Sequence, residues 1–238
     1  MESGASTNAE RIMRAMKSAH PMRTTLLVLA AAGLLLGGCA SSTPLPPVVD
    51  LPVQSAMQKQ RHDCSVTLYG DSILNGVLGT TGKERLAEPP AAVVERLRPA
   101  YSVVDRSVPG DFAVWRSSQF KRDRVNTRLV VFEHGMNDAN QKFDYAEPLR
   151  SMIRRVKTLG KTPIVTGLSR APKVGTRDVY DAMARRIATE EGAIFADWGA
   201  VSMAVTDLQD DLHPGQAYST RLAEQLVQAL DRAAPECR

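Results

Sequence analysis

Between residues 64 and 233, short apolar runs alternate with longer amphipathic stretches, and no other feature constrains the fold as strongly. Runs rich in β-branched residues predict strands over 65–69, 101–105, 128–132, 162–168 and 193–196. Apolar residues at three- and four-residue steps predict helices over 91–97, 145–159, 177–191 and 217–233. Strands that alternate with helices favour a parallel sheet covered on both faces. The predicted fold class is therefore α/β, with a five-stranded parallel sheet.

Polar clusters follow the first three predicted strands, and a fourth cluster precedes the last helix. They read Gly70-Asp71-Ser72, Asp105 to Asp111, Gly135-Met136-Asn137-Asp138 and Asp210-Asp211-Leu212-His213. In parallel sheets ligands bind beyond the carboxyl ends of the strands, so these clusters are expected to lie near the site. A serine, an asparagine, a glycine and an Asp/His pair are what acyl transfer needs. Serine is a poor nucleophile without a base, and the oxyanion needs fixed donors.

Each cluster also has an ordinary structural interpretation. Gly-Asp-Ser is common in turns, and Gly-Met-Asn-Asp is typical of loops that tolerate left-handed backbone. An Asp-x-x-His segment before a helix can serve as a cap with a solvated imidazole. The chemical interpretation is favoured because all the clusters occur together, in this order, at the ends of the predicted elements.

The ordered set resembles the SGNH hydrolase superfamily, also called GDSL-type esterases and lipases, over residues 64–233. The resemblance implies that Ser72 is the nucleophile, that His213 takes its proton and that Asp210 orients the His213 ring. It also implies an oxyanion hole made by the backbone N–H groups of Ser72 and Gly110 and the side-chain amide of Asn137. The fold that it implies is a flavodoxin-like three-layer α/β/α architecture, and it implies no metal and no organic cofactor.

The chain departs from the family pattern at a few positions. Ile73 stands where leucine is usual, and Asp105 and Ser107 occupy the first two marked positions of a block that usually reads N-x-G-x-x-G. Aspartate is doubled at 210 and 211. Only Asp210 has the family spacing to the histidine, so Asp211 is expected at the surface.

Competing motifs fail on inspection. The segment around Ser72 lacks the second glycine of the G-x-S-x-G turn of α/β-hydrolases, and no His/Cys spacing suggests zinc. We interpret His62 and His134 as non-catalytic. The basic run formed by Lys121, Arg122 and Arg124 is expected to be a solvated helix face.

The first 39 residues are typical of a bacterial lipoprotein. The run over 26–36 is apolar or small throughout and follows Lys17 and Arg23; it is too short for a membrane-spanning helix, which needs about 20 residues. Leu36-Gly37-Gly38-Cys39 resembles a lipobox, which implies cleavage before a lipidated Cys39, and the following alanine implies outer-membrane sorting. The alternative is a buried helix with a chance cysteine. Translation from Met16 or Met22 also stays open.

This interpretation divides the chain into a signal peptide over 1–38, a lipidated Cys39 with a Pro/Ser-rich tether over 39–60, and a hydrolase domain over 61–238. The predicted location is the periplasmic side of the outer membrane. Removal of residues 1–38 takes away four basic and two acidic side chains and lowers the net charge from +4 to +2. A balance this small favours no nucleic-acid partner.

With Cys39 lipidated, Cys64 and Cys237 remain. An exported compartment is oxidising, so the pair predicts a disulfide that joins the ends of the domain; the alternative is two unpaired thiols.

The predicted function is a serine ester hydrolase that acts through an acyl-enzyme at the cell envelope. Its substrate is expected to be an ester-bearing small molecule, a glycan with O-acetyl groups or a lipid. Two alternatives stay open on the same fold: an O-acetyltransferase that excludes water, and a catalytically silent binding lipoprotein.

Overall fold

The computed structural model describes residues 62–79 and 84–238. The predicted signal peptide over 1–38, the lipidation site at Cys39 and the tether over 39–60 lie outside the described residues. Among the helices of the described ranges, none has the length and hydropathy needed to cross a bilayer.

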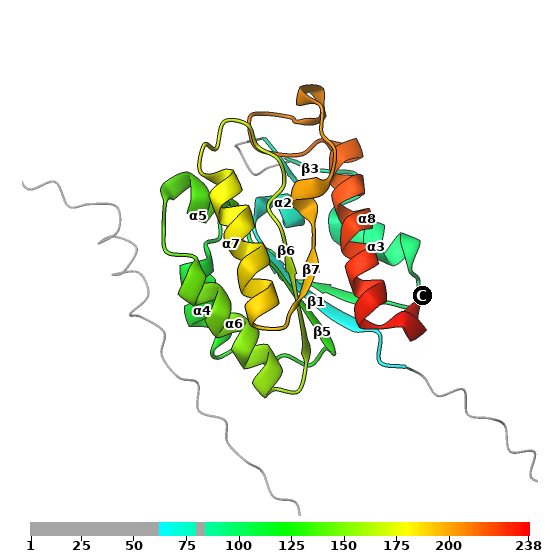
Figure 1. Ribbon diagram of the computed structural model, residues 1–238. Helices are drawn as coiled ribbons and strands as arrows, with labels where there is room; N and C mark the ends of the chain where they lie inside the picture. The colour runs from blue at the N-terminus through cyan, green and yellow to red at the C-terminus, as the bar shows by residue number, and fades with distance from the viewer. Residues whose placement is uncertain (1–61, 80–83) are drawn as a thin grey trace, which may run out of the picture. The chain divides into compact units, whose positions relative to one another are not determined.

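A five-stranded sheet forms the centre of the domain (Figure 1). All its neighbouring strands pair in parallel, in the order β4-β1-β5-β6-β7. The strands are β1 (Ser65–Gly70), β4 (Ser102–Asp105), β5 (Leu129–Glu133), β6 (Thr162–Thr166) and β7 (Ile194–Ala196). The prediction of a five-stranded parallel sheet is confirmed. Strand β6 ends two residues before the predicted boundary.

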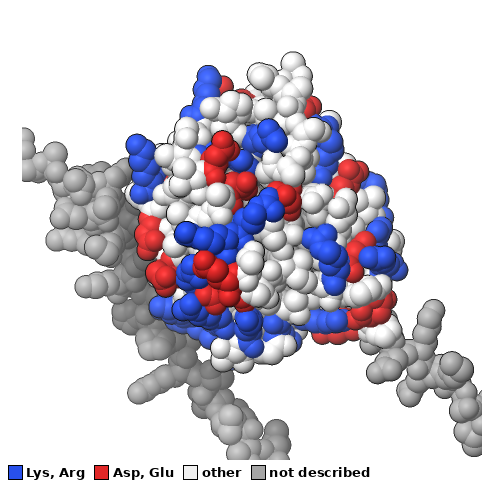
Figure 2. Space-filling model, in the orientation of Figure 1, with Lys and Arg blue, Asp and Glu red and all other residues white. Residues whose placement is uncertain are grey.

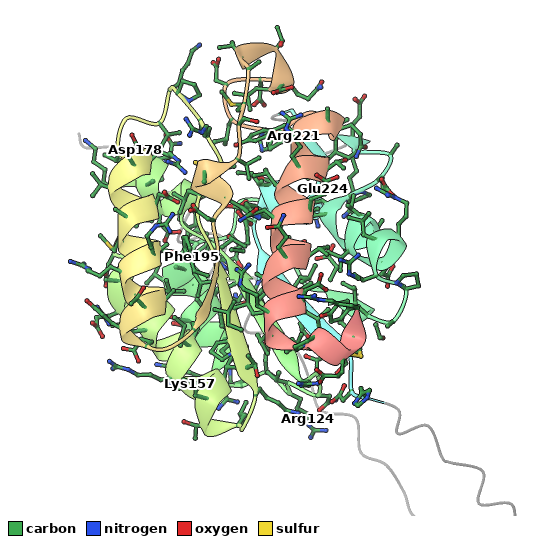
Figure 3. The ribbon with its side chains drawn as sticks, turned by 45° about the vertical axis from the view of Figure 1, so that its right-hand side comes forward. Arg124, Lys157, Asp178, Phe195, Arg221 and Glu224 are labelled. Atoms are coloured by element: carbon green, nitrogen blue, oxygen red, sulfur yellow. A yellow bond between two sulfur atoms is a disulfide. The ribbon has the colours of Figure 1, made fainter. Side chains whose placement is uncertain are left out.

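Helices cover both faces of this sheet (Figure 1). Helices α3 (Pro90–Leu97) and α8 (Gln216–Ala233) pack against each other on one face. The other face carries α4 (Ala113–Phe120), α6 (Ala146–Thr158) and α7 (Arg177–Glu190). Figure 3 shows α7 and α8 on either side of the edge strand β7, where Phe195 is labelled. The domain is thus a three-layer α/β/α sandwich, which confirms the predicted fold class.

The strand sequences explain this sandwich. Central strands that are covered on both faces need apolar side chains at every position rather than at alternate ones. In β5 all five residues, Leu129 to Glu133, are buried. The last of them is a glutamate, and its burial at the end of an apolar strand requires polar partners.

Several short elements were not predicted from the sequence. They are α4, α2 (Ser72–Asn75), α5 (Met136–Gln141) and the two-stranded pair β2 (Val77–Leu78) and β3 (Glu84–Arg85). The prediction of a helix face at Lys121, Arg122 and Arg124 is wrong, because α4 ends at Phe120. The three basic residues are exposed, and they lie on the turn and loop that follow the helix.

Positive and negative side chains are intermixed on the face that Figure 2 shows. Ion pairs between helices account for part of this mixture. Arg150 of α6 contacts both Glu190 and Glu191 at the end of α7, and Arg154 lies 2.6 Å from Glu191. The Lys157 ammonium, labelled in Figure 3, donates to the Glu191 carbonyl at 2.7 Å.

A disulfide joins Cys64, directly before β1, to Cys237, the last residue of the short 3-10 helix η3 (Pro235–Cys237) that follows α8. Their Cα atoms lie 5.7 Å apart, although 173 residues separate them in sequence. Cys237 is fully buried. The bridge therefore closes almost the whole domain into one covalent loop.

We expect removal of this bridge to destabilise the domain strongly. In a chain-entropy model, a loop of this length stabilises the folded state by about 4–5 kcal/mol. The urea midpoint of the wild-type chain should fall on reduction. The double variant Cys64→Ser/Cys237→Ser should show the same low midpoint with and without reductant, which makes it the matched control. Equal midpoints for oxidised and reduced wild-type chain would contradict the prediction.

Candidate active site

The pairing of β1 brings two loops to the end of this strand. On one side, Arg106 and Val108 follow β4 and donate from their backbone N–H groups to the carbonyls of Leu68 and Gly70, each at 2.8 Å. On the other side, Gly70 is the register partner of Glu133 in β5. The loops that follow β4, β1 and β5 therefore start side by side.

The loop after β1 presents Ser72 on a sharp turn. Asp71 has extended backbone, and its carboxylate accepts the Ile73 N–H at 2.9 Å, which caps the short helix α2. Gly76 ends α2 in the left-handed region, at a φ of 77°, where glycine is favoured. The turn leaves Ser72 only 7% exposed, at the amino end of α2.

The segment before α8 brings a histidine to this serine. His213 Nε2 lies 3.0 Å from Ser72 Oγ, and His213 Nδ1 lies 2.8 Å from Asp210 Oδ2. The other oxygen of Asp210 accepts the backbone N–H groups of Leu212 and His213, at 2.7 and 2.6 Å. Burial opposes ionisation of Asp210, but these hydrogen bonds from His213 and Leu212 lower its pKa below the usual value. The structure thus brings Ser72, His213 and Asp210 into one hydrogen-bonded chain.

Asn137 lies against the residues next to Ser72 and Gly110. Its amide Nδ2 donates to the Asp111 carbonyl at 3.0 Å and to Asp71 Oδ2 at 3.2 Å. Gly110 has a φ of +77°, and a Cβ at this position would meet nothing within 4 Å but would be strained. Within the described ranges, the backbone N–H groups of Ser72 and Gly110 donate to no other residue.

The departures from the family pattern have local explanations. The Asp105 carboxylate accepts the N–H of Ser107 at 2.9 Å, and Ser107 Oγ in turn lies 3.1 Å from the Asn75 amide on α2. Ile73 is buried in the core. Asp211 is exposed, as expected, and forms a surface ion pair with Lys173 at 2.6 Å.

Three buried polar side chains, whose contacts the sequence did not reveal, hold the loop after β4. Arg116 of α4 donates to Asp111 Oδ2 at 2.7 Å, and His134 Nε2 lies 3.2 Å from the same oxygen. Burial favours a higher pKa for Asp111, but the hydrogen bond from His134 and the charge of Arg116 hold it below its usual value. Burial lowers the pKa of His134. His134 therefore contacts Asp111 rather than Ser72, and His62 is exposed at the start of the described chain.

A second buried carboxyl ties this loop to α5. Asp138 is fully buried and accepts the N–H of Ala113, the first residue of α4, at 3.1 Å. Burial raises the pKa of Asp138 to about 7, although the hydrogen bond from Ala113 opposes the shift. The only signal in the sequence was the position of Asp138 directly after Asn137. Over the residues with described placement, no cluster of histidine, cysteine, aspartate or glutamate has the arrangement of a metal site.

The model of the GDSL-like lipase/acylhydrolase family matches residues 68–221. No curated protein matches the chain in sequence. Solved structures with a similar fold include TesA, with 23% identity, coverage of 71% of this chain and 98% of that chain, and a TM-score of 0.57. A variant of Axe2, an acetyl xylan esterase from Geobacillus stearothermophilus, has 21% identity, coverage of 70% and 94%, and a TM-score of 0.57. The psychrotrophic esterase EstA from Pseudoalteromonas sp., inhibited by monoethylphosphonate, has 12% identity, coverage of 73% and 100%, and a TM-score of 0.60.

The segment that the family model matches is more than half of the chain, and it contains all five residues to which the sequence assigns catalytic or oxyanion roles. The chain therefore belongs to the GDSL-like lipase/acylhydrolase family and is an ester hydrolase of the SGNH type.

Proposed function

We propose that the chain hydrolyses esters through an acyl-enzyme formed on Ser72. The observation that carries this proposal is the hydrogen-bonded chain from Asp210 through His213 to Ser72, with contacts of 2.8 and 3.0 Å. A neutral imidazole that donates from Nδ1 to the Asp210 carboxylate has its Nε2 lone pair free to take the serine proton. Asp210 also fixes the backbone of His213, so the ring has one orientation.

The chemistry proceeds in two balanced halves. In the first, the Ser72 hydroxyl proton passes to His213 Nε2 while Oγ forms a bond to the ester carbonyl carbon. The bond to the alcohol oxygen then breaks, and that oxygen takes the proton from Nε2. In the second, water gives a proton to Nε2 and its oxygen attacks the acyl carbon. The bond to Oγ breaks, Oγ recovers the proton, and the carboxylic acid leaves.

The oxyanion that forms in each half needs donors fixed before the reaction. In this proposal they are the N–H groups of Ser72 and Gly110, which no described residue uses, and one N–H of the Asn137 amide, which turns from its contact with Asp71 or the Asp111 carbonyl to the oxyanion. One such donor contributes about 10²–10³-fold to the rate in enzymes of this chemistry. The left-handed backbone of Gly110 and the contact of Asn137 with the Asp111 carbonyl hold the donors in place.

The proposals for the substrates and for the location of the protein are based on its sequence. We infer from the lipobox-like segment that ends at Cys39 and from the Pro/Ser-rich tether that the domain acts at the periplasmic side of the outer membrane, on O-acetylated glycans or lipid esters. Axe2 is an acetyl xylan esterase, which supports an acetylated carbohydrate as one substrate class.

Ser72 is the residue on which the proposed hydrolysis depends. Ser72→Ala should lower the hydrolysis of p-nitrophenyl esters by about 10³-fold or more, because the variant has no nucleophile. A series of acyl chain lengths should be measured with the wild type. Preference for acetyl supports a glycan deacetylase, and preference for long chains supports a lipase. Equal rates for the wild type and the variant, or no hydrolysis by either, would refute the catalytic proposal.

Asp210 and Asp211 provide a matched pair of variants. Asp210→Asn should lower kcat by about 10²–10⁴-fold, since an amide cannot accept hydrogen bonds at both of its ends. Asp211→Asn removes only an exposed ion pair with Lys173 and should leave kcat within about twofold. Steady-state kinetics on a p-nitrophenyl ester checks both. A similar loss of kcat in the two variants would contradict the role assigned to Asp210.

The proposed anchor is tested separately. Cells that express the wild-type chain and are grown with a radiolabelled fatty acid should label the protein, and Cys39→Ala should abolish the label. The variant should also leave the membrane fraction, because two or more acyl chains are needed for stable anchoring. Labelling that persists in Cys39→Ala would refute the lipidation site.

A further inference from the structure

Three aromatic side chains gather on the surface beside the loop that carries Gly110. Trp115 of α4 is 56% exposed, and Phe143, in the loop after α5, is 40% exposed. Phe112 contacts both, with its ring centroid 4.5 Å from that of Trp115 and 5.0 Å from that of Phe143. Apolar residues that are exposed singly are ordinary on a protein surface, whereas a contiguous group of them indicates a binding site. These three residues form an aromatic platform.

The backbone places the aromatic platform next to the proposed oxyanion donors. Phe112 is two residues after Gly110, so the Cα atoms of the two residues are at most about 7 Å apart. Phe143 donates from its backbone N–H to the carbonyl of Asp138, the neighbour of Asn137, at 2.9 Å. A substrate whose ester carbonyl lies at Gly110 and Asn137 therefore has its other groups within reach of the platform.

Trp115 is on the solvent side of α4. The buried residues of this helix recur at three- and four-residue steps and are Ala113, Arg116, Ser117 and Phe120. Trp115 lies on the opposite side of the helix, and the Phe112 ring packs against its indole at an interplanar angle of 69°. Ring area that stays in water does not stabilise the fold, but it stabilises a complex when a ligand covers it.

Polar side chains border the platform at Phe143. Gln141, Lys142 and Asp144 are all exposed beside it in the sequence. The Tyr180 hydroxyl donates to the Phe143 carbonyl at 2.7 Å. An amide, an ammonium, a carboxylate and a phenol hydroxyl thus lie at this border, and together they offer both donors and acceptors to the hydroxyl groups of a ligand.

The exposure of the platform distinguishes between the substrate classes. An acyl chain is apolar on all sides, so it is stabilised most in an enclosed cavity. A pyranose ring needs cover on one face only, because its hydroxyl groups stay in water while its C–H groups contact the aromatic ring. The face of an aromatic ring is negative and attracts these slightly positive C–H groups. A lipid surface favours clustered Lys and Arg around the rings, whereas a lysine and an aspartate flank Phe143.

We propose that Phe112, Trp115 and Phe143 form a subsite for a pyranose ring, so that the substrate is an O-acetylated glycan. This inference rests on the proposed function, which supplies the hydrolysis of the acetyl ester at Ser72. The glycan lies across the platform while the ester carbonyl points at the oxyanion donors. Contacts of this kind are the same before and during the reaction, so their loss should raise KM more than it lowers kcat.

The kinetic test compares two acetyl esters, of which only one contains pyranose rings. They are partly O-acetylated cellotetraose and ethyl acetate, and the acetic acid released is titrated at constant pH. Trp115→Ala should raise KM for the cellotetraose ester by about 10-fold or more and leave kcat/KM for ethyl acetate within about twofold. Trp115→Phe keeps an aromatic face and should raise KM by no more than about threefold. Equal changes for both esters, or no change for either, would overturn the inference.

Leu159 provides a matched control, because it is also a large exposed apolar residue. It is 41% exposed and lies after α6, at the edge of the sheet where β6 begins. Leu159→Ala should leave KM and kcat for the cellotetraose ester within about twofold of wild type. Circular dichroism and thermal unfolding report whether each variant is folded. A rise in KM as large as that of folded Trp115→Ala would overturn the inference.

Tryptophan fluorescence gives a readout that needs no catalysis. Of the two tryptophans, Trp115 is exposed and Trp198 is fully buried. Cellotetraose without acetyl groups, added above the KM of its acetylated form, should change the emission of the wild-type chain. Trp115→Phe should abolish this change, because only Trp198 then emits. No change in the wild-type chain, or a change that persists in Trp115→Phe, would overturn the inference.

Other occupants of the platform predict different results, and each of these results would overturn the inference. For an acyl chain, Trp115→Ala lowers the hydrolysis of p-nitrophenyl octanoate far more than that of p-nitrophenyl acetate and leaves the cellotetraose ester unaffected. For a bilayer, the emission of Trp115 responds to vesicles of phosphatidylethanolamine and phosphatidylglycerol but not to cellotetraose. For a second copy of the chain, Trp115→Ala halves the sedimenting mass and leaves KM unchanged.

The proposed function and the aromatic subsite fail in different ways. If Ser72→Ala hydrolyses the cellotetraose ester as fast as wild type, the proposed function fails. If Ser72→Ala is inactive while Trp115→Ala hydrolyses that ester with the KM of wild type, only the inference about the platform fails.

Discussion

The parallel pairing of β1 on both of its edges is the constraint on which the active site depends. It aligns the ends of β4, β1 and β5, so that three loops from distant parts of the chain begin at one edge of the sheet. The Ser72 turn, the Gly110 loop and Asn137 each follow one of these strands. The fourth contribution, His213, is 141 residues from Ser72 and reaches it because α8 packs back over the sheet.

Buried carboxyl groups fix the loops at this edge. Asp71 caps the nucleophile turn, Asp138 caps α4, and Asp111 pairs with Arg116. Burying such groups is costly unless backbone N–H groups or a guanidinium compensates them, and here each one has such a partner. Polar contacts of this kind are directional, which is what a site needs when its donors must be in place before the charge develops.

Much of this arrangement could be predicted from the sequence. The central strand β5 is apolar up to its last residue, so 128–132 was found within one residue of it, and the resemblance to the SGNH pattern indicated Ser72 and His213. Helices α2, α4 and α5 could not be found in this way, because helices this short depend on tertiary contacts. The N-terminus of α4 has no cap of its own and takes one from Asp138, which is 25 residues away.

The contact between the buried residues Asp71 and Glu133 could not be predicted from the sequence either. Asp71 stands in a predicted cluster and Glu133 directly follows the predicted strand 128–132, but a linear sequence does not show that Gly70 is opposite Glu133 in the sheet. Register depends on the pairing of whole strands, and only the assembled sheet brings the Asp71 N–H to the Glu133 carboxylate.

The disulfide and the active site lie at opposite ends of β1. Cys64 directly precedes β1, whose six residues advance about 3.3 Å each, so Ser72 lies about 20 Å away at the far edge. The covalent link between the two ends of the domain therefore lies remote from the chemistry. The residue before β1 is thus held covalently to the end of the chain, about 20 Å from the serine whose reactivity the other end of the strand controls.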